Sequence, residues 1–188
     1  MDEKFALLKN SASRASFRVL DLGSAPGSWS LYVMRTLMQK GYLKSSEGQV
    51  VVSVDLSALS RQHDQGLFDR ADFHFIQGDF TLPAIREEII ALGPYNLILS
   101  DAAPATSGNR TLDSLRSLAL GECALEYAVL SLAPGGKLVI KVFQGGGSDE
   151  LLKAIRGRFS LGKSFKPQAS RAESFETYYL GLTVLGQK

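Results

Sequence analysis

The chain has 188 residues, of which 45% are hydrophobic and 21% charged, the composition of an ordinary soluble globular protein that can bury a full core. Its formal net charge of +2 and its isoelectric point of about 8.7 permit nucleic-acid binding without demonstrating it, and the single cysteine, Cys123, excludes an internal disulfide framework and a multi-cysteine zinc site. No signal peptide and no apolar run of membrane-spanning length is found, which predicts a cytoplasmic protein without a membrane partner.

Strand and helix patterns alternate along the whole sequence. In its first half we expect a short helix in residues 1–9, strand 17–22, helix 29–39, strand 49–55, a weak helix in 57–69, strand 72–77, helix 83–92 and strand 95–100. In its second half we expect helix 111–132, strand 137–143, helix 148–159 and strands 161–165 and 175–185. The valine run of residues 49–55 is typical of a parallel strand covered on both faces. The pattern predicts one α/β domain over residues 1–188, with a doubly wound, mostly parallel seven-stranded sheet into which the final hairpin inserts an antiparallel strand.

The helix predicted at 111–132 is apolar along much of its length. Its pattern includes Leu112, Leu115, Leu118, Ala119, Cys123, Leu125 and Tyr127. We expect Cys123 to be a small buried hydrophobic residue. Pro134 and the two glycines after it end the helix.

A small-residue turn, Gly-Ser-Ala-Pro-Gly-Ser at 23–28, joins the first strand to its helix. Gly23 and Gly27 allow backbone angles closed to other residues, and Ser28 stands where an N-cap is expected. A strand, a glycine loop and a helix N-terminus form the first nucleotide-binding turn of a Rossmann-like sheet, or a plain strand-to-helix turn. The loop lacks the GxGxxG spacing, so a dinucleotide is not its expected ligand.

Three predicted strands have an acid at or just after their carboxyl end, where open α/β sheets bind ligands. Asp55 is placed to accept hydrogen bonds from a ribose diol, Asp79 to meet an adenine amino group, and Asp101 follows the fourth strand. Each could instead be a helix cap or a turn residue. Acidic walls without a phosphate-cradling basic group suit the cationic sulfonium of S-adenosylmethionine.

Lys141 lies in the middle of an apolar strand, Leu-Val-Ile-Lys-Val-Phe at 138–143. A lysine is almost never fully buried without a partner, so it either reaches water from an edge strand or lies beside an acid. Glu176 lies in the aromatic-rich segment Phe-Glu-Thr-Tyr-Tyr at 175–179 and is either an outward-facing strand residue or part of a site.

The motifs together resemble the FtsJ/RrmJ family of ribose 2′-O-methyltransferases, in particular its RlmE branch, which acts on large-subunit ribosomal RNA. The matching pieces occur in family order: Asp-Leu-Gly-Ser-Ala-Pro-Gly-Ser-Trp-Ser at 21–30, Gln-Gly-Asp-Phe at 77–80, Leu-Ser-Asp-Ala-Ala-Pro at 99–104 with Ser-Gly at 107–108, Leu-Ala-Pro-Gly-Gly at 132–136, Val-Ile-Lys-Val-Phe-Gln-Gly at 139–145, Lys-Pro-Gln-Ala-Ser-Arg at 166–171 and Ser-Phe-Glu-Thr-Tyr at 174–178. They cover nearly the whole chain from residue 17. The glutamine after Val-Phe and the Lys-Pro run favour the rRNA branch over the tRNA branch.

The resemblance implies the class I methyltransferase fold, transfer of a methyl group from S-adenosylmethionine to a ribose 2′-hydroxyl, and no metal ion. It implies that the substrate is a uridine of 23S rRNA, within the large (50S) ribosomal subunit or its precursor, and that the protein is a monomer. The cofactor-binding residues that it implies are Gly27, Trp29, Asp55, Asp79 and Asp101. Asp101, Lys141 and Glu176 match three members of the family's catalytic Lys-Asp-Lys-Glu set. Lys141 is then the candidate base for the hydroxyl proton, with Asp101 and Glu176 orienting it.

The family's first catalytic lysine lies ahead of the first strand, in a motif that this sequence does not show. The chain opens with Met-Asp-Glu-Lys-Phe, which resembles the family segment on the carboxyl side of that motif. Either the leading segment is missing, or Lys4 or Lys9 takes its place.

A run of basic residues without an intervening acid offers a surface that could follow RNA phosphates, or a solvated basic face. It comprises Lys153, Arg156, Arg158, Lys163, Lys166 and Arg171. Alternative functions are a tRNA 2′-O-methyltransferase, a non-catalytic ribosome assembly factor that binds S-adenosylmethionine, and a nicotinamide dehydrogenase, although the last would be expected to have GxGxxG.

Overall fold

A computed structural model describes residues 2–8, 17–43, 50–166 and 175–185. Its strands are β1 (Val19–Leu22), β2 (Val51–Asp55), β3 (Phe73–Gln77), β4 (Tyr95–Ser100), β5 (Leu132–Phe143), β6 (Phe159–Phe165) and β7 (Glu176–Val184). Its helices are α1 (Asp2–Phe5), α2 (Ser28–Gln39), α3 (Pro83–Ala91), α4 (Arg110–Ser131) and α5 (Ser148–Arg158), with a short 3₁₀ turn, η1 (Leu67–Asp69).

The strands form one seven-stranded sheet in the order β3-β2-β1-β4-β5-β7-β6. The first five strands are parallel, and β7 pairs antiparallel with both β5 and β6. This arrangement confirms the predicted doubly wound sheet with an inserted antiparallel strand. Its order reverses between β1 and β4, which is where such sheets open a ligand crevice at their carboxyl edge.

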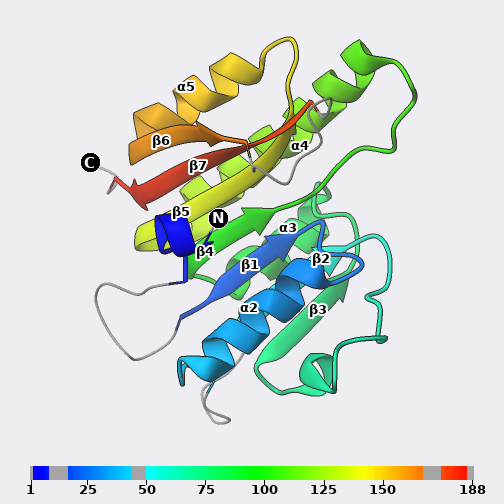
Figure 1. The fold of residues 1–188 in the computed structure, drawn as a ribbon, viewed down its shortest axis with the longest axis vertical. Coiled ribbons are helices and arrows are strands. Elements are labelled where there is room, and N and C mark those ends of the chain that lie inside the picture. The colour runs from blue at the N-terminus through cyan, green and yellow to red at the C-terminus, as the bar shows by residue number, and fades with distance from the viewer. Residues whose placement is uncertain (1, 9–16, 44–49, 167–174, 186–188) are drawn as a thin grey trace.

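Helices cover both faces of the sheet: α2 lies in front of it in Figure 1, and α3 and α4 lie behind. Alternate side chains of each central strand therefore enter two different cores. Leu20 and Leu22 belong to the core with α3, α4 and α5, whereas Val19 belongs to the core with α1 and α2. Burial on both faces explains why β2 and β4 read as nearly continuous apolar runs. No helix in the described ranges has the length and apolar character needed to cross a membrane.

The structure corrects several local predictions. Residues 57–69 contain only the short turn η1, because the segment makes side-chain and loop contacts in place of a helical ladder. Arg61 bonds to both Asp64 and Asp69, and the Ser60 backbone N–H donates to the Pro26 carbonyl over the glycine turn. The predicted helix at 1–9 is limited to α1, which ends before Ala6, a residue with a positive φ of 51°.

The structure of α4 corrects the prediction for Cys123 and shows a feature that the apolar pattern does not indicate. Leu112 and Leu115 are 39% and 51% exposed, although they belong to the apolar pattern of the helix. In the same turns Asp113 and Ser117 are buried. Cys123 is only half-buried, at the side of the helix where Arg86 and Glu126 lie.

Candidate active site

A cavity of about 650 Å³ opens at the carboxyl edge of the sheet. Its walls come from the ends of β1 to β5 and from the first turns of α4. The lining residues are Gly23, Ala25, Asp55, Leu56, Asp79, Phe80, Thr81, Asp101, Ala102, Ala103, Pro104, Ala105, Arg116, Ala119, Leu120 and Lys141. The structure thus brings Asp55, Asp79 and Asp101, which the sequence placed at separate strand ends, into one cavity with Lys141, which it placed in the middle of a strand.

The turn after β1 forms the floor of this cavity with bare backbone. Gly23 has a φ of +74°, and a Cβ there would lie 2.4 Å from the Ala102 backbone, so only glycine fits. Gly27 is the N-cap of α2 with a φ of +112°, and Ser28 is the first helical residue, so the predicted N-cap at Ser28 is wrong. Gly27 has no side chain to cap α2, and the buried Asp21 carboxyl already bonds to Ser30 in its first turn, so part of the positive end of the helix dipole is left for an anionic group.

The two acids at the ends of β2 and β3 each support a turn while lining the cavity. Asp55 accepts hydrogen bonds from the backbone N–H of Ala25 at 2.9 Å and of Ser57 at 2.8 Å. Asp79 accepts from the Thr81 N–H and hydroxyl at 2.9 and 2.7 Å. A carboxylate has about four acceptor positions, so each acid can bind a ligand as well as its turn.

Asp101 and Lys141 meet at the edge between β4 and β5. Lys141 Nζ lies 3.1 Å from Asp101 Oδ1, and the side chains are 11% and 31% exposed. Of the two alternatives for Lys141, the one that places it beside an acid is therefore correct. Burial raises the pKa of Asp101, and the neighbouring Lys141 charge opposes that rise. The negative charge of Glu176 raises the pKa of Asp101 a little further, which puts Glu176 within electrostatic reach of the pair.

Tyr178 is a member of this cluster that the sequence analysis did not identify. It pairs in register with Lys141, and its hydroxyl donates to Asp101 Oδ1 at 3.4 Å. Burial and the Asp101 charge raise its pKa, so the phenol stays a donor. The available signal was its spacing: Tyr178 lies two residues after Glu176 on a strand, so both point to the same face.

Trp29 contacts Tyr178 of this cluster and lines a second cavity. Its ring stacks on Tyr178, with centroids 5.7 Å apart and planes at 27°. With Leu97, Leu99 and residues of α1 and α2 it lines an apolar cavity of about 340 Å³ on the α2 face of the sheet. Gly27, Trp29 and Glu176 are not among the residues that line the larger cavity, so the structure does not bring these three predicted residues into it.

Asp21 is the second residue that the sequence analysis did not single out. It lies in β1, is fully buried, and accepts a 2.6 Å hydrogen bond from the Ser30 hydroxyl, which also lies 2.8 Å from the Ser53 hydroxyl. Burial raises its pKa from 3.8 to about 7, although the Ser30 bond acts in the opposite direction. The charges of Asp101 and Asp55 contribute to the rise, so the three acids share one region of negative potential.

Of the two candidates for a further catalytic lysine, Lys4 and Lys9, the structure describes Lys4. Lys4 is exposed on α1, and its Nζ lies 5.3 Å from the ring centre of Phe165. Phe165 pairs with Tyr178, which pairs with Lys141, so Phe165 and Lys141 are two strand spacings, or about 10 Å, apart in one row. Lys9 lies outside the described residues.

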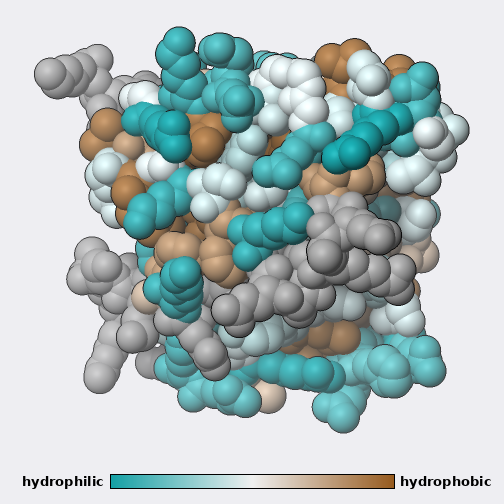
Figure 2. All heavy atoms as spheres, turned by 45° about the horizontal axis from the view of Figure 1, so that its top comes forward, coloured by the Kyte–Doolittle hydropathy of each residue, from teal (hydrophilic) through white to brown (hydrophobic). Residues whose placement is uncertain are grey.

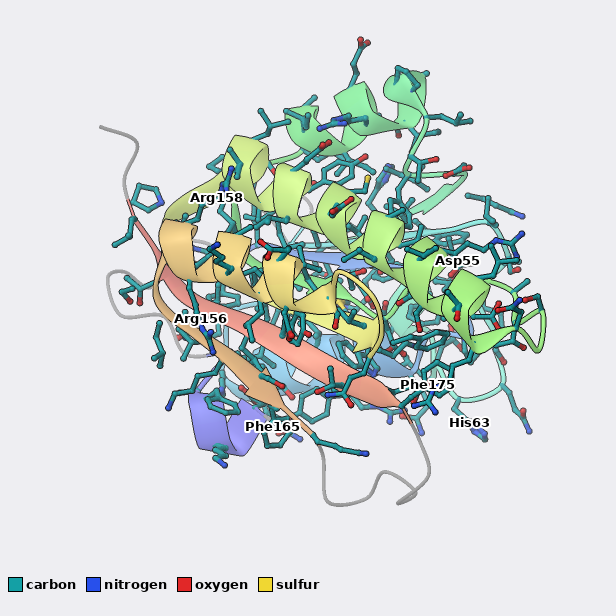
Figure 3. The ribbon with its side chains drawn as sticks, turned by 90° about the horizontal axis from the view of Figure 1, so that it is seen from above. Asp55, His63, Arg156, Arg158, Phe165 and Phe175 are labelled. Carbon is teal, nitrogen blue, oxygen red and sulfur yellow. The ribbon has the colours of Figure 1, made fainter. Side chains whose placement is uncertain are left out.

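Of the basic run, two members that the structure describes lie away from the cavity. Arg156 and Arg158 lie at the end of α5 remote from Asp55 (Figure 3), and they donate to the carbonyls of Gly162 and Ala154. Arg171 lies outside the described residues. In the view of Figure 2, hydrophilic side chains separate the exposed apolar ones into small patches. Nearer the cavity, Arg116 lines it and the Arg110 guanidinium lies 5.1 Å from the ring centre of Phe175.

Comparison with known proteins gives relatives along nearly the full chain. It is 42% identical to a ribosomal RNA large subunit methyltransferase E of Treponema denticola, over 99% of this chain and 84% of the relative. It is 37% identical to the protein of the same name from Borrelia duttonii, over 96% and 82% of the two chains.

The solved structures that it resembles share the fold. A protein described as a ribosomal RNA methyltransferase from Plasmodium falciparum superposes with a TM-score of 0.73 at 24% identity, over 99% of this chain and 93% of the other. Human methyltransferase-like protein 13, solved in complex with S-adenosylhomocysteine, gives 0.59 at 14% identity over 92% and 74%. The family model described as FtsJ-like methyltransferase matches residues 1–184, and the chain therefore belongs to the FtsJ-like methyltransferase family.

Proposed function

We propose that this methyltransferase transfers a methyl group from S-adenosylmethionine to the 2′-hydroxyl of a uridine in 23S rRNA, within the large ribosomal subunit or its precursor. Its relatives' names support the RNA substrate. The observation that carries the chemistry is the 3.1 Å contact between Lys141 and Asp101 at the edge of the 650 Å³ cavity.

The cavity fits the cofactor in the character of its donor and acceptor groups. Asp55 would accept hydrogen bonds from the ribose hydroxyls, and Asp79 from the adenine amino group. The uncapped start of α2 would receive the carboxylate of the methionine part. The carboxylates of Asp55 and Asp79 at neighbouring strand ends would balance the positive sulfonium. When bound, the cofactor supplies an electrophilic methyl group on that sulfonium.

Lys141 would accept the proton of the ribose hydroxyl as the new carbon–oxygen bond forms, because a neutral hydroxyl is a weak nucleophile. To do so, Lys141 must first yield a proton to Asp101. Burial raises the pKa of Asp101 and thereby lowers the cost of that transfer. The Tyr178 hydroxyl, which donates to Asp101 Oδ1, holds the carboxyl in place while the proton moves. Orientation of the two reactants is expected to supply much of the acceleration.

The cations near the cavity give the RNA a place to bind. Arg116 lines the cavity, and Arg110 lies over Phe175, the residue before Glu176. Both belong to the first two turns of α4, so phosphates beside the target ribose could be bound there. In this proposal Arg110 and Arg116 hold the RNA close to the reacting atoms, and the distant end of α5 does not.

The deciding experiment is methyl transfer from labelled S-adenosylmethionine to large ribosomal subunits that lack the modification, with the labelled nucleotide then mapped. We expect label at a ribose of 23S rRNA, and no transfer by Lys141→Ala. Label on tRNA would identify a tRNA methyltransferase. Cofactor binding without transfer to either RNA would favour an assembly factor, and binding of NAD in place of S-adenosylmethionine would contradict the proposal entirely.

A further inference from the structure

The first turns of α4 have their polarity reversed relative to an ordinary core-facing helix. Leu112 and Leu115 face outward, while Asp113, Ser114 and Ser117 are 3%, 3% and 1% exposed. Burial of polar groups is costly unless they are hydrogen-bonded, and apolar side chains would serve stability alone. The hydrogen-bond partners of these three side chains therefore indicate why polar residues are buried at these positions.

Asp113 binds the loop that comes after β4. Its carboxylate accepts the Ser107 backbone N–H at 2.9 Å and the Ser107 hydroxyl at 2.8 Å. The Asn109 N–H donates in turn to the Ser107 hydroxyl, and Asn109 caps α4 through its side chain. The hydrogen bonds from Ser107 lower the pKa of Asp113, so it is an anion at neutral pH.

This loop carries Asp101 at its start and forms one wall of the larger cavity. The Asp101 N–H donates to the Leu22 carbonyl at 3.1 Å, and Ala102 packs directly on Gly23. Ala103 and Ala105 line the cavity but are exposed and belong to no helix or strand. The wall is thus tied to the sheet at one end and to Asp113 at the other.

Ser114 and Ser117 bind the segment that comes after Lys141. The Ser117 hydroxyl accepts the Phe143 N–H at 3.0 Å, and the Ser114 hydroxyl donates to the Gln144 carbonyl at 3.3 Å. A Cβ at Gly145 would collide with the Ser114 side chain, which shows how closely the turn after β5 is packed on the helix. The buried polar row therefore contacts the segments after both catalytic strand ends.

We propose that Asp113 and Ser117 are positioning residues: Asp113 fixes the cofactor-facing wall that begins at Asp101, and Ser117 fixes the strand end that carries Lys141. α4 thereby sets the spacing of the two groups that act on the ribose hydroxyl. This inference rests on the proposed function, because it assigns the cavity to the cofactor. Each arm has its own measurable effect, since the wall lines the cofactor cavity over residues 101–105, whereas Lys141 is the one residue of β5 in the lining.

The test compares Asp113→Asn and Ser117→Ala by calorimetric titration with S-adenosylhomocysteine and by methyl transfer at saturating substrates. For Asp113→Asn we expect dissociation constants raised about tenfold or more, because charge-assisted hydrogen bonds to the wall are lost. For Ser117→Ala we expect an unchanged dissociation constant and a kcat about tenfold lower, because Lys141 is misplaced. Matched controls are Asp149→Asn, an exposed acid in the first turn of α5, and Ser131→Ala, a buried serine in the last turn of α4 that bonds to the Tyr127 carbonyl. Both should leave the two quantities unchanged.

Amide hydrogen exchange separates this inference from the proposed function. Asp113→Asn should speed exchange in residues 102–109, and Ser117→Ala in residues 143–147, each without affecting the other segment. If the unaltered protein failed to bind S-adenosylhomocysteine, the proposed function would fall while the exchange pattern still decided whether the two ties exist. If both variants only lowered the melting temperature, with exchange, affinity and kcat as in the controls, the residues would be merely structural and the inference wrong.

Discussion

Asp21 predicts that the protein loses stability as the pH rises toward 7. The carboxyl is fully buried, and its Oδ1 has no hydrogen-bond partner among the residues that the structure describes. Burial raises its pKa from 3.8 to about 7, against the hydrogen bond of Ser30 and with help from the charges of Asp101 and Asp55. A neutral carboxyl is easier to bury than a charged one, which is why the folded protein retains the proton.

Proton linkage gives the sign and the size of the effect. Because the folded pKa lies above the unfolded value, the folded protein holds a proton that the unfolded chain has lost between pH 3.8 and about 7. The stabilisation is fully present below the lower value and disappears as the pH rises through the upper one. The slope is about 1.4 kcal/mol per pH unit, so the whole interval from 3.8 to about 7 sets an upper limit of about 4 kcal/mol.

Urea unfolding of the unaltered protein and of Asp21→Asn, at intervals from pH 5 to pH 7, measures this effect. As the pH rises, the free energy of unfolding of the unaltered protein should decrease by about 1.4 kcal/mol per pH unit relative to that of Asp21→Asn. Asp113→Asn is the control: the pKa of Asp113 is lowered, so its contribution is lost only under acid conditions and its difference should stay constant above pH 5. A constant difference for Asp21→Asn would refute the reasoning. If that variant does not fold, the carbon-13 titration of the Asp21 carboxyl in the unaltered protein decides.

Three further predictions concern the proposed function. Asp55→Ala should weaken binding of S-adenosylmethionine in a calorimetric titration, since each charge-assisted hydrogen bond lost is worth about 1.5–3 kcal/mol, and unchanged affinity would remove Asp55 from the site. Lys141→Ala should leave cofactor affinity nearly intact and cut methyl transfer by about 10²–10⁴; Lys141→Arg should not restore it, because arginine stays protonated, and near-normal turnover in Lys141→Arg would exclude the general-base role. Methyl transfer to RNA should fall steeply with added salt because phosphate contacts are screened, and either indifference to salt or equal use of free nucleosides would contradict an RNA substrate.

The sheet could be predicted because its strands lie between two layers of helices. Residues 51–54 are buried on both faces and are three valines interrupted only by Ser53, and β4 at Tyr95–Ser100 has the bounds expected from its sequence. The late hairpin was recognisable as well, since two strand patterns near the end of the chain are separated by a polar segment. The family resemblance, which the match over residues 1–184 confirms, rested on motifs at the strand ends.

The parts that sequence reasoning missed depend on contacts between distant segments. Asp113 and Ser117 are buried only because the loops after β4 and β5 present backbone groups that need partners, and no local pattern records that need. Tyr178 joins the cluster because β7 is inserted beside β5, opposite Lys141. Ser28 fits the residue preference of an N-cap, yet Gly27 occupies that place because only glycine tolerates its positive φ beside Phe68.

The charge balance of the carboxyl edge supports the cofactor that we propose for this protein. The charges of Asp55 and Asp101 both raise the pKa of Asp21, and Lys141 contacts Asp101. A dinucleotide would bring two phosphates into this negative region, and burial there would make the repulsion stronger than in water. A sulfonium brings a positive charge to the same place and lowers the cost of keeping the acids ionised. In the proposed function these acids therefore favour S-adenosylmethionine over a ligand that brings phosphates, and the proton that Asp21 retains reduces the repulsion from Asp55 and Asp101.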